Sequence, residues 1–153
     1  MIYSYRPTAE TDLADILLLD QVANPHPWGQ ASIEQNLKPE QKRLNWLVLD
    51  QNQQVCGWLT ASNVLDESEL ELIIVSPHMR RQGLAQGLIQ AWLKHIKSIP
   101  VNLCMLEVRE SNLAARHLYE KLGFIEVGKR KNYYPTELGK EAAILMNLTL
   151  SKD

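Results

Sequence analysis

The strand–turn–helix unit of residues 68–96 constrains the fold more than any other part of the chain. Ser68–Val75, SELELIIV, alternates polar and apolar residues and becomes wholly apolar from Ile73. That change is typical of a strand that becomes buried on both faces or carries a bulge. The next turn, RRQGLAQGL (Arg80–Leu88), leads into Gly83–Ile96, whose apolar residues recur with helical spacing. This order indicates an α/β fold.

The other segments predict one domain, residues 1–153, with a mixed sheet. Helices are expected at 11–22 and 30–37, and another at 112–122, with Ser111 as N-cap and Gly123 in a left-handed conformation at its end. Strands are expected at 2–6, 45–50, 55–62, 69–75, 101–108, 124–130 and 142–150.

Length and composition exclude several classes of protein. A chain of 153 residues buries a core without metals or disulfides, and 45% hydrophobic with 22% charged residues is ordinary for a globular protein. A net charge of −2 argues against direct nucleic-acid binding. Cys56 and Cys104 lie far apart with no CxxC pair, so we expect reduced thiols and no metal site.

The N-terminus lacks a basic region followed by an apolar core, so it does not resemble a secretory signal. No apolar run approaches the ~20 residues that a membrane span needs. We therefore expect a cytoplasmic protein with no membrane partner.

The glycine-rich turn has two interpretations. A helix N-terminus presents unpaired N–H groups to an anion, glycine lets the anion approach the backbone, and Arg80 and Arg81 add positive charge. The turn lacks the Gly-Lys-Ser/Thr ending of a Walker A loop, and its GxxxG spacing is not the GxGxxG of dinucleotide sites. The alternative is a helix start with close packing. A strand with unpaired backbone groups beside a phosphate site would suit coenzyme A, an extended amide arm that ends in a pyrophosphate.

The sequence resembles a known family. Arg80–Ala85, RRQGLA, resembles the Q/R-x-x-G-x-G/A acetyl-CoA loop of the GNAT N-acetyltransferases, with alanine at position 85 where many relatives have glycine. Almost the whole chain resembles the RimI-type branch, the bacterial ribosomal-protein-alanine N-acetyltransferases. The segments that carry this are HPW (26–28), LEVRESNLAARHLYEKLGF (106–124) and KRKNYYPTELGKEAAILM (129–146).

The resemblance implies the GNAT fold, a mixed and mostly antiparallel sheet of six to seven strands with a splayed central strand and about four flanking helices. It implies acetyl-CoA as co-substrate, no metal, and a basic protein N-terminus as acceptor, the N-terminal alanine of a small-subunit ribosomal protein. By this resemblance the residues that bind acetyl-CoA are Ile73, Ile74, Val75, Arg80, Arg81, Gln82, Gly83, Leu84, Ala85, Gln86 and Asn112. Glu107 would be the general base and Tyr119 the general acid.

The chemistry of these two residues is compatible with those roles but allows others. A carboxylate near the acceptor removes a proton from an ammonium group, whereas Glu107 alone also suits an ion pair with Arg109 or a solvated strand end. Tyr119 lies two helical turns after Asn112 and on the same face, although a half-buried core tyrosine is the default there. The backbone N–H of Val75 would meet the developing oxyanion.

Two further groups have open interpretations. The acidic residues Asp66, Glu67, Glu69 and Glu71 suit either attraction of a basic peptide or a solvated hairpin. The wall of the acceptor site would include Tyr133, Tyr134, His26 and Trp28, and the alternative for the tyrosines is an aromatic lid over the core. Two other functions remain: acetylation of lysine side chains, polyamines or drug amines, and a coenzyme-A-binding sensor without catalysis.

Overall fold

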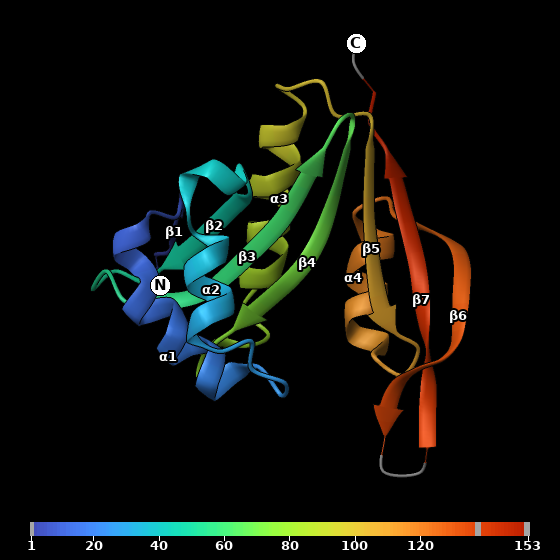
Figure 1. Cartoon of the computed structure of the whole chain (residues 1–153), viewed down its shortest axis with the longest axis horizontal. Helices are drawn as coiled ribbons and strands as arrows, with labels where there is room; N and C mark the ends of the chain where they lie inside the picture. Colours follow the sequence, from blue (N-terminus) through green and yellow to red (C-terminus); the bar gives the residue numbers. More distant parts are fainter. Residues whose placement is uncertain (1, 137–138, 152–153) are drawn as a thin grey trace.

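The computed structural model describes residues 2–136 and 139–151. Seven strands form one mixed sheet in the order β1-β2-β3-β4-β5-β7-β6 (Figure 1). The strands are β1 (Ser4–Pro7), β2 (Leu44–Leu49), β3 (Val55–Val64), β4 (Glu67–Val75), β5 (Leu103–Arg109), β6 (Ile125–Thr136) and β7 (Gly139–Thr149). The helices are α1 (Leu13–Ala23), α2 (Gln30–Asn36), α3 (Leu84–Ile96) and α4 (Leu113–Lys121), with short 3-10 turns η1 (Glu10–Asp12), η2 (Pro39–Gln41) and η3 (Pro77–Met79).

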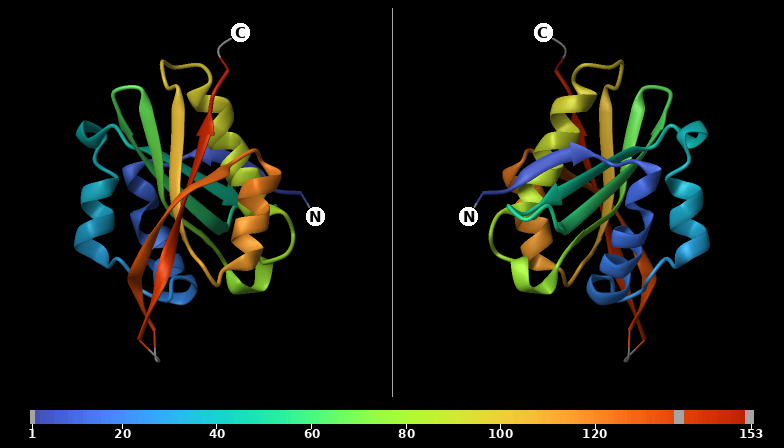
Figure 2. Two further views of the ribbon diagram at one scale, coloured as in Figure 1. Left: turned by 90° about the vertical axis from the view of Figure 1, so that its right-hand side faces the viewer. Right: turned by 90° about the vertical axis from the view of Figure 1, so that its left-hand side faces the viewer.

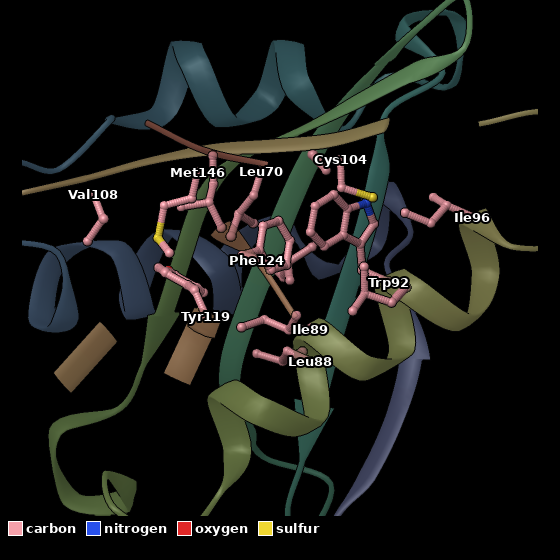
Figure 3. Packing of buried hydrophobic residues seen from close by; sticks show 14 of the residues in the cluster. Leu70, Leu88, Ile89, Trp92, Ile96, Cys104, Val108, Tyr119, Phe124 and Met146 are labelled. Atoms are coloured by element: carbon pink, nitrogen blue, oxygen red, sulfur yellow. The ribbon is translucent and has the colours of Figure 1, made fainter. Parts of the chain in front are cut away.

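The helices cover both faces of the sheet. Figure 2 shows α1 and α2 on one face and α3 and α4 on the other. On the α3/α4 face, the rings of Trp92, Phe124 and Tyr119 form a row, with centroids 6.4 Å and 6.0 Å apart (Figure 3). On the α1/α2 face, Ile16 and Ile33 pack against Trp58. α3 is held by its apolar stripe, as the spacing of its residues predicts, whereas α1 leaves Leu18 and Val22 exposed.

The sheet splits between its two central strands. β4 pairs with β3 along its length, but its parallel pairing with β5 covers only Glu67–Leu70 against Leu103–Leu106. Residues 71–75 of β4 and 107–109 of β5 then diverge, which Figure 1 shows as a gap between the two ribbons. The expected GNAT fold with its splayed central strand is therefore confirmed.

A bulge in β4 accompanies the splay. Thr60 and Ala61 of β3 face Leu72 and Leu70, so Glu71 is the extra residue. An extra residue reverses the alternation of side chains, and Leu70 accordingly joins the α3/α4 core whereas Leu72 contacts the α1/α2 core. Both expectations for the SELELIIV segment, a bulge and burial on two faces, are confirmed.

Some boundaries differ from those expected. The N-cap of α4 is Asn112, whose Oδ1 accepts the Ala115 N–H at 3.2 Å, and not Ser111. The chain leaves β5 through a turn in which the Asn112 N–H donates to the Arg109 carbonyl, so the helix begins one residue later. Gly123 is left-handed, with φ of 103°, as predicted. β6 extends to Thr136 and includes Tyr133 and Tyr134.

None of the helices in the described ranges is long and apolar enough to cross a bilayer. Cys56 and Cys104 are buried and do not form a disulfide, as expected.

Candidate active site

The open edge of β4 presents main-chain groups at two positions. The Ser76 N–H donates to the Cys56 carbonyl at 2.7 Å, so the neighbouring pair, Gly57 and Val75, is a non-hydrogen-bonded pair of the antiparallel ladder. By the same alternation Ile73 directs its N–H and C=O away from β3, whereas Ile74 uses its groups toward Trp58. Three residues of β4 are expected to bind acetyl-CoA. Of these, Ile73 therefore directs its N–H and C=O into the gap, and Val75 directs its N–H there.

The glycine-rich turn has the backbone of an anion site. Arg81 and Gly83 both have positive φ, 66° and 78°, and α3 begins immediately afterwards at Leu84. A turn with left-handed residues directs successive N–H groups into a shared concavity, and the helix N-terminus adds its partial positive charge. A Cβ on Gly83 would have no atom within 4 Å, so the space above this turn is open.

The second glycine of the turn has a different role. A Cβ on Gly87 would lie 2.0 Å from the Tyr5 hydroxyl oxygen of β1. Gly87 is thus required for α3 to pack against Tyr5. Each interpretation of the turn thus applies to one glycine. Gly83 leaves open space above the turn, and Gly87 permits close packing of α3 against Tyr5.

Side chains of the turn brace it from outside. The Arg80 guanidinium donates to the Val75 carbonyl at 3.4 Å and to the Ala23 carbonyl at 3.3 Å, which ties the end of β4 to the end of α1. Gln82 Oε1 accepts the Tyr3 hydroxyl, and Gln86 Oε1 accepts the Lys121 ammonium at 3.1 Å. Leu84 is buried, and Ala85 packs against the same core.

Tyr119 lies on the α3/α4 face of the sheet. It is 6% exposed and packs edge-on against Phe124 (Figure 3). Burial, with a smaller contribution from Tyr134, raises the pKa of the Tyr119 phenol to about 12. The phenol is therefore protonated across the physiological range. Asn112, at the other end of the same face of α4, is exposed and caps the helix.

Glu107 lies on the opposite face of β5. Its neighbours Leu106 and Val108 join the α3/α4 core, so Glu107 faces the α1/α2 side. Its carboxylate is 3.3 Å from Arg130 of β6 and its side chain is 21% exposed. The alternative ion pair with Arg109 is wrong, because Arg109 instead pairs with Glu141 at 3.2 Å.

The acidic residues of the 66–71 segment lie in two places: Asp66 is at the β3–β4 turn, and Glu69 and Glu71 are on β4. Asp66 accepts a hydrogen bond from Asn102 near the β3–β4 turn, and Glu71 pairs with Arg43. Glu69 is half-buried, and burial together with the charges of Glu71 and Glu107 raises the pKa of its carboxyl. The α1/α2 side of the split therefore carries three carboxylates, of which Glu71 is paired with Arg43 and Glu107 with Arg130.

Aromatic residues from β6 border the same side. The rings of Tyr133 and Tyr134 are 5.1 Å apart, and the Arg109 guanidinium lies 4.3 Å from the centre of the Tyr134 ring. Burial first, and then Glu107, raises the pKa of Tyr134. His26 Nε2 is 3.2 Å from Arg109 Nη2, while Trp28 packs edge-on against Trp58. His26 and Tyr134 thus gather at Arg109, and Trp28 belongs to the core.

Three residues of this region carry contacts that sequence reasoning did not anticipate. Arg109 was considered only as a partner for Glu107, and Arg130 and Asp20 were not considered. The alternation of the segment LEVR, which puts Arg109 and Glu107 on one face, was the available signal. Arg130 had none, because its partner Glu107 lies on another strand; the partners of Asp20, which are Asn24, Trp28 and Gly29, lie within nine residues of it but form no recognised motif.

Other features of the described residues lie apart from the split. A cavity of about 390 Å³ beside the β1–β2 edge is lined by residues of η2, β2 and the β1–η1 connection, and includes neither Glu107 nor Tyr119. Within the described ranges no three His, Cys, Asp or Glu side chains form a group that could hold a metal ion.

Comparison with known proteins identifies the family. Residues 12–124 match the model of the Acetyltransferase (GNAT) family. The chain is 39% identical to the [Ribosomal protein bS18]-alanine N-acetyltransferase of Escherichia coli K12, over 92% of this chain and 93% of that protein, and 38% identical to the protein of the same name in Haemophilus influenzae, over 88% and 90%.

Solved structures agree with the sequence matches. The crystal structure of the ribosomal-protein-S18-alanine N-acetyltransferase from Escherichia coli superposes with a TM-score of 0.90 at 35% identity, covering 98% of this chain and 95% of that one. Arabidopsis thaliana NAA60 in complex with acetyl-CoA shares the fold, with a TM-score of 0.85 at 19% identity, covering 97% and 99%. With this agreement over almost the full length, the chain belongs to the acetyltransferase (GNAT) family and is an N-acetyltransferase.

Proposed function

We propose that this enzyme transfers the acetyl group of acetyl-CoA to the N-terminal α-amine of a protein, with the N-terminal alanine of ribosomal protein bS18 as acceptor. The observation that carries the proposal is the split between β4 and β5, with Glu107 on one face and Tyr119 on the other. The identity of 39% to a bS18-alanine N-acetyltransferase over 92% of the chain supports this acceptor.

Acetyl-CoA supplies the acetyl group as a thioester. The open N–H and C=O of Ile73 suit its amide arm, the Val75 N–H is left for the thioester carbonyl, and the turn from Arg81 to Gln86 suits its pyrophosphate. The side chain of Asn112 lies at the start of α4 for a further contact. Arg80 supports the site by fixing the ends of β4 and α1.

Glu107 acts as the general base in this proposal. A chain-terminal α-amine has a reference pKa near ~8, so at neutral pH most of it is protonated and unreactive. The Glu107 carboxylate, directly or through one water, accepts the proton that the amine loses as it becomes an amide. Arg130 lies beside the carboxylate and keeps it oriented toward β6.

Tyr119 acts as the acid from the other face. The phenol donates a hydrogen bond to the sulfur as it leaves, while the Val75 N–H donates to the carbonyl oxygen as negative charge develops there. With a pKa of about 12, Tyr119 is a weaker acid than a thiol, whose reference pKa is ~8.5. Tyr119 therefore stabilises the departing thiolate more by its hydrogen bond than by complete transfer of its proton.

The charge of the acceptor side agrees with a basic protein N-terminus. Glu69 and Glu107 lie on the face that the amine must approach, and both attract a cationic peptide. The acceptor proposed is a ribosomal protein, so we place the enzyme in the cytoplasm. The reaction needs no nucleic-acid or membrane partner.

A panel of acceptors tests the proposal. Purified enzyme and acetyl-CoA are incubated with peptides that begin with Ala followed by basic residues, with the same peptides blocked at the N-terminus but carrying lysine, and with spermidine. Mass spectrometry should find acetyl on the free α-amine first. Modification of only lysine or spermidine would transfer the proposal to side-chain or small amines. Tight acetyl-CoA binding without release of thiol for any amine would indicate a sensor.

A further inference from the structure

We infer that Arg109 is the positioning residue of the acceptor site, where one guanidinium fastens the α1–α2 loop to the β6–β7 hairpin across the mouth of the split. The inference rests on the proposed function in so far as this mouth is where the acceptor enters. Arg109 lies at the end of β5, two residues after Glu107 and on the same face.

On the hairpin side, Arg109 makes three contacts. Its Nη1 donates to the Pro135 carbonyl at 3.3 Å and to Glu141 Oε1 at 3.2 Å, and its guanidinium lies over the Tyr134 ring at 4.3 Å. The second oxygen of Glu141 accepts the Ser111 N–H at 3.1 Å. Hydrogen bonds from Ser111 and Arg109 hold the pKa of Glu141 below its ordinary value, so it stays a carboxylate.

On the loop side, Arg109 contacts His26. The Nη2 atom is 3.2 Å from His26 Nε2, and because arginine only donates, that nitrogen must accept. The α1–α2 loop continues from α1, which packs against β3 and β4, whereas the hairpin pairs with β5. This contact therefore joins the two halves of the sheet at the open end of the split, where they share no strand pairing.

The loop is preformed to present His26. Asp20 at the end of α1 is fully buried, and its two oxygens accept the Asn24 side-chain amide and the backbone N–H groups of Trp28 and Gly29 at 3.0–3.2 Å. The His26 N–H donates to Asn24 Oδ1 at 3.0 Å. With both ends of the loop fixed, the His26–Arg109 contact sets the distance between the loop and Tyr134.

The physical consequence is a selective effect on acceptor binding. Without the guanidinium, the loop and the hairpin separate, and only the fraction of molecules with the wall closed binds the acceptor well. Apparent affinity falls by that fraction. Glu107 stays paired with Leu145 in the β5–β7 ladder and Arg130 with Ala143, away from the end of the hairpin, so turnover of bound acceptor should change little. Lysine is no substitute, because one ammonium cannot hold the fork of contacts that Arg109 makes.

The test compares Arg109→Gln, Arg109→Lys and His26→Ala with wild type and with Arg6→Gln. Arg6 is the matched control, since it forms a two-bond ion pair with Asp12 far from the split. We expect Arg109→Gln to raise the KM for the Ala-starting peptide about tenfold, with kcat and the KM for acetyl-CoA within about threefold. Arg6→Gln should lower stability and leave the peptide KM unchanged. A normal peptide KM in Arg109→Gln, or a loss confined to kcat, overturns the inference.

A second measurement does not depend on the acceptor. Hydrogen exchange followed by mass spectrometry should show faster exchange at residues 26–29 and 131–136 in Arg109→Gln, but not in Arg6→Gln. Unchanged exchange in both segments overturns the inference, even if the wild type acetylates some other amine. The proposed function fails separately, when wild-type enzyme with normal exchange leaves the Ala-starting peptide unmodified.

Discussion

At the scale of single residues, Glu107 on β5 and Tyr119 on α4 owe their different surroundings to the two faces of the sheet. Glu107 is partly exposed beside Arg130, on the α1/α2 side of the sheet, where Glu69 and Glu71 also lie. Tyr119 is buried among apolar side chains on the other side, and its pKa is raised to about 12. A carboxylate in contact with water accepts a proton, whereas a buried neutral phenol is kept as a donor. The two groups that we propose as base and acid thus lie on opposite faces of the sheet.

Replacement of either group should slow the chemical step. We expect Glu107→Gln and Tyr119→Phe each to lower kcat by ~10² or more, because general acid–base groups contribute about that much. Acetyl-CoA affinity, measured by calorimetry, should stay close to that of wild type. Glu126→Gln, an exposed carboxylate on β6, is the control for loss of one negative charge. Near-normal turnover in both variants would remove these residues from the mechanism.

Tyr119 should also be visible in alkaline titration. The phenol ionises near ~10 in the unfolded chain and near 12 in the folded protein. The raised pKa therefore favours folding below pH ~10, and this contribution is lost as pH rises from ~10 to 12. Absorbance at 295 nm should lose its highest-pH tyrosine transition in Tyr119→Phe. Loss of a transition near pH 10 instead would mean that the phenol is exposed.

Residue roles could be predicted from sequence only where a local motif carries them. RRQGLA and the 106–124 segment resemble the GNAT family, and this resemblance predicted that the turn residues, Glu107 and Tyr119 belong to the site. The alternative of an ion pair between Glu107 and Arg109 does not occur, because strand alternation brings Arg109 to the same face but does not reveal that β7 places Glu141 beside it. Contacts between elements depend on register, which one sequence does not specify.

At the scale of elements, α3 shows how one glycine-rich turn serves two purposes. Gly83 is left-handed at the start of the helix with open space around it, whereas Gly87 lies one turn later against Tyr5. Periodicity predicted the helix and its stripe of Leu84, Leu88, Ala91, Trp92 and Ile96. Of these, Ala91 is only partly buried, while Ile89 and Leu93 are buried as well. Periodicity could not distinguish the glycines, because β1 is far away in sequence. The break in SELELIIV predicted the β4 bulge for a local reason, the reversal of alternation.

The two glycines should respond differently to alanine. Gly83→Ala places a side chain at φ of 78° in free space, which costs about 1 kcal/mol of unfolding free energy. Gly87→Ala collides with the Tyr5 ring and should cost about 1–3 kcal/mol. In a Tyr5→Ala background the Gly87→Ala change should become stabilising, because alanine favours a helix. Urea unfolding measures each. Equal costs of Gly87→Ala in both backgrounds would rule out the Tyr5 contact as the cause.

The stability of the protein should also depend on the contacts that Asp20 makes with the α1–α2 loop. Both oxygens of this buried carboxylate accept N–H groups, so Asp20→Asn turns an NH₂ group toward at least one donor. An unsatisfied buried group costs about 1–3 kcal/mol. Asp15→Asn, an exposed aspartate on the same helix, is the control and should change stability little. Equal unfolding free energies for the two variants, from urea titration, would contradict this account of the loop.

At the scale of the whole molecule, the sheet consists of two halves joined by a short seam. Only residues 67–70 of β4 and 103–106 of β5 pair across the centre, while β1–β4 and β5–β7 are each continuous. The composition and element order predicted one mixed sheet, and the resemblance implied the splay. The contacts that span the open end, such as His26 with Arg109, follow from the tertiary arrangement and not from any local pattern.

A ligand that binds in the split contacts both halves of the sheet and should raise the free energy of unfolding. A ligand at ~100 times its Kd stabilises the folded state by about 2.7 kcal/mol. For a chain of this size that raises Tm by roughly 5–10 °C. Acetyl-CoA should also slow hydrogen exchange at residues 73–75 and in the 81–86 turn. Adenosine 3′-phosphate 5′-diphosphate, which keeps the pyrophosphate but lacks the amide arm, should protect the turn but not 73–75. If acetyl-CoA instead protected the cavity beside η2 and β2 and left both segments unchanged, the split would not be its binding site, and the functions assigned to Glu107 and Tyr119 would lose their basis.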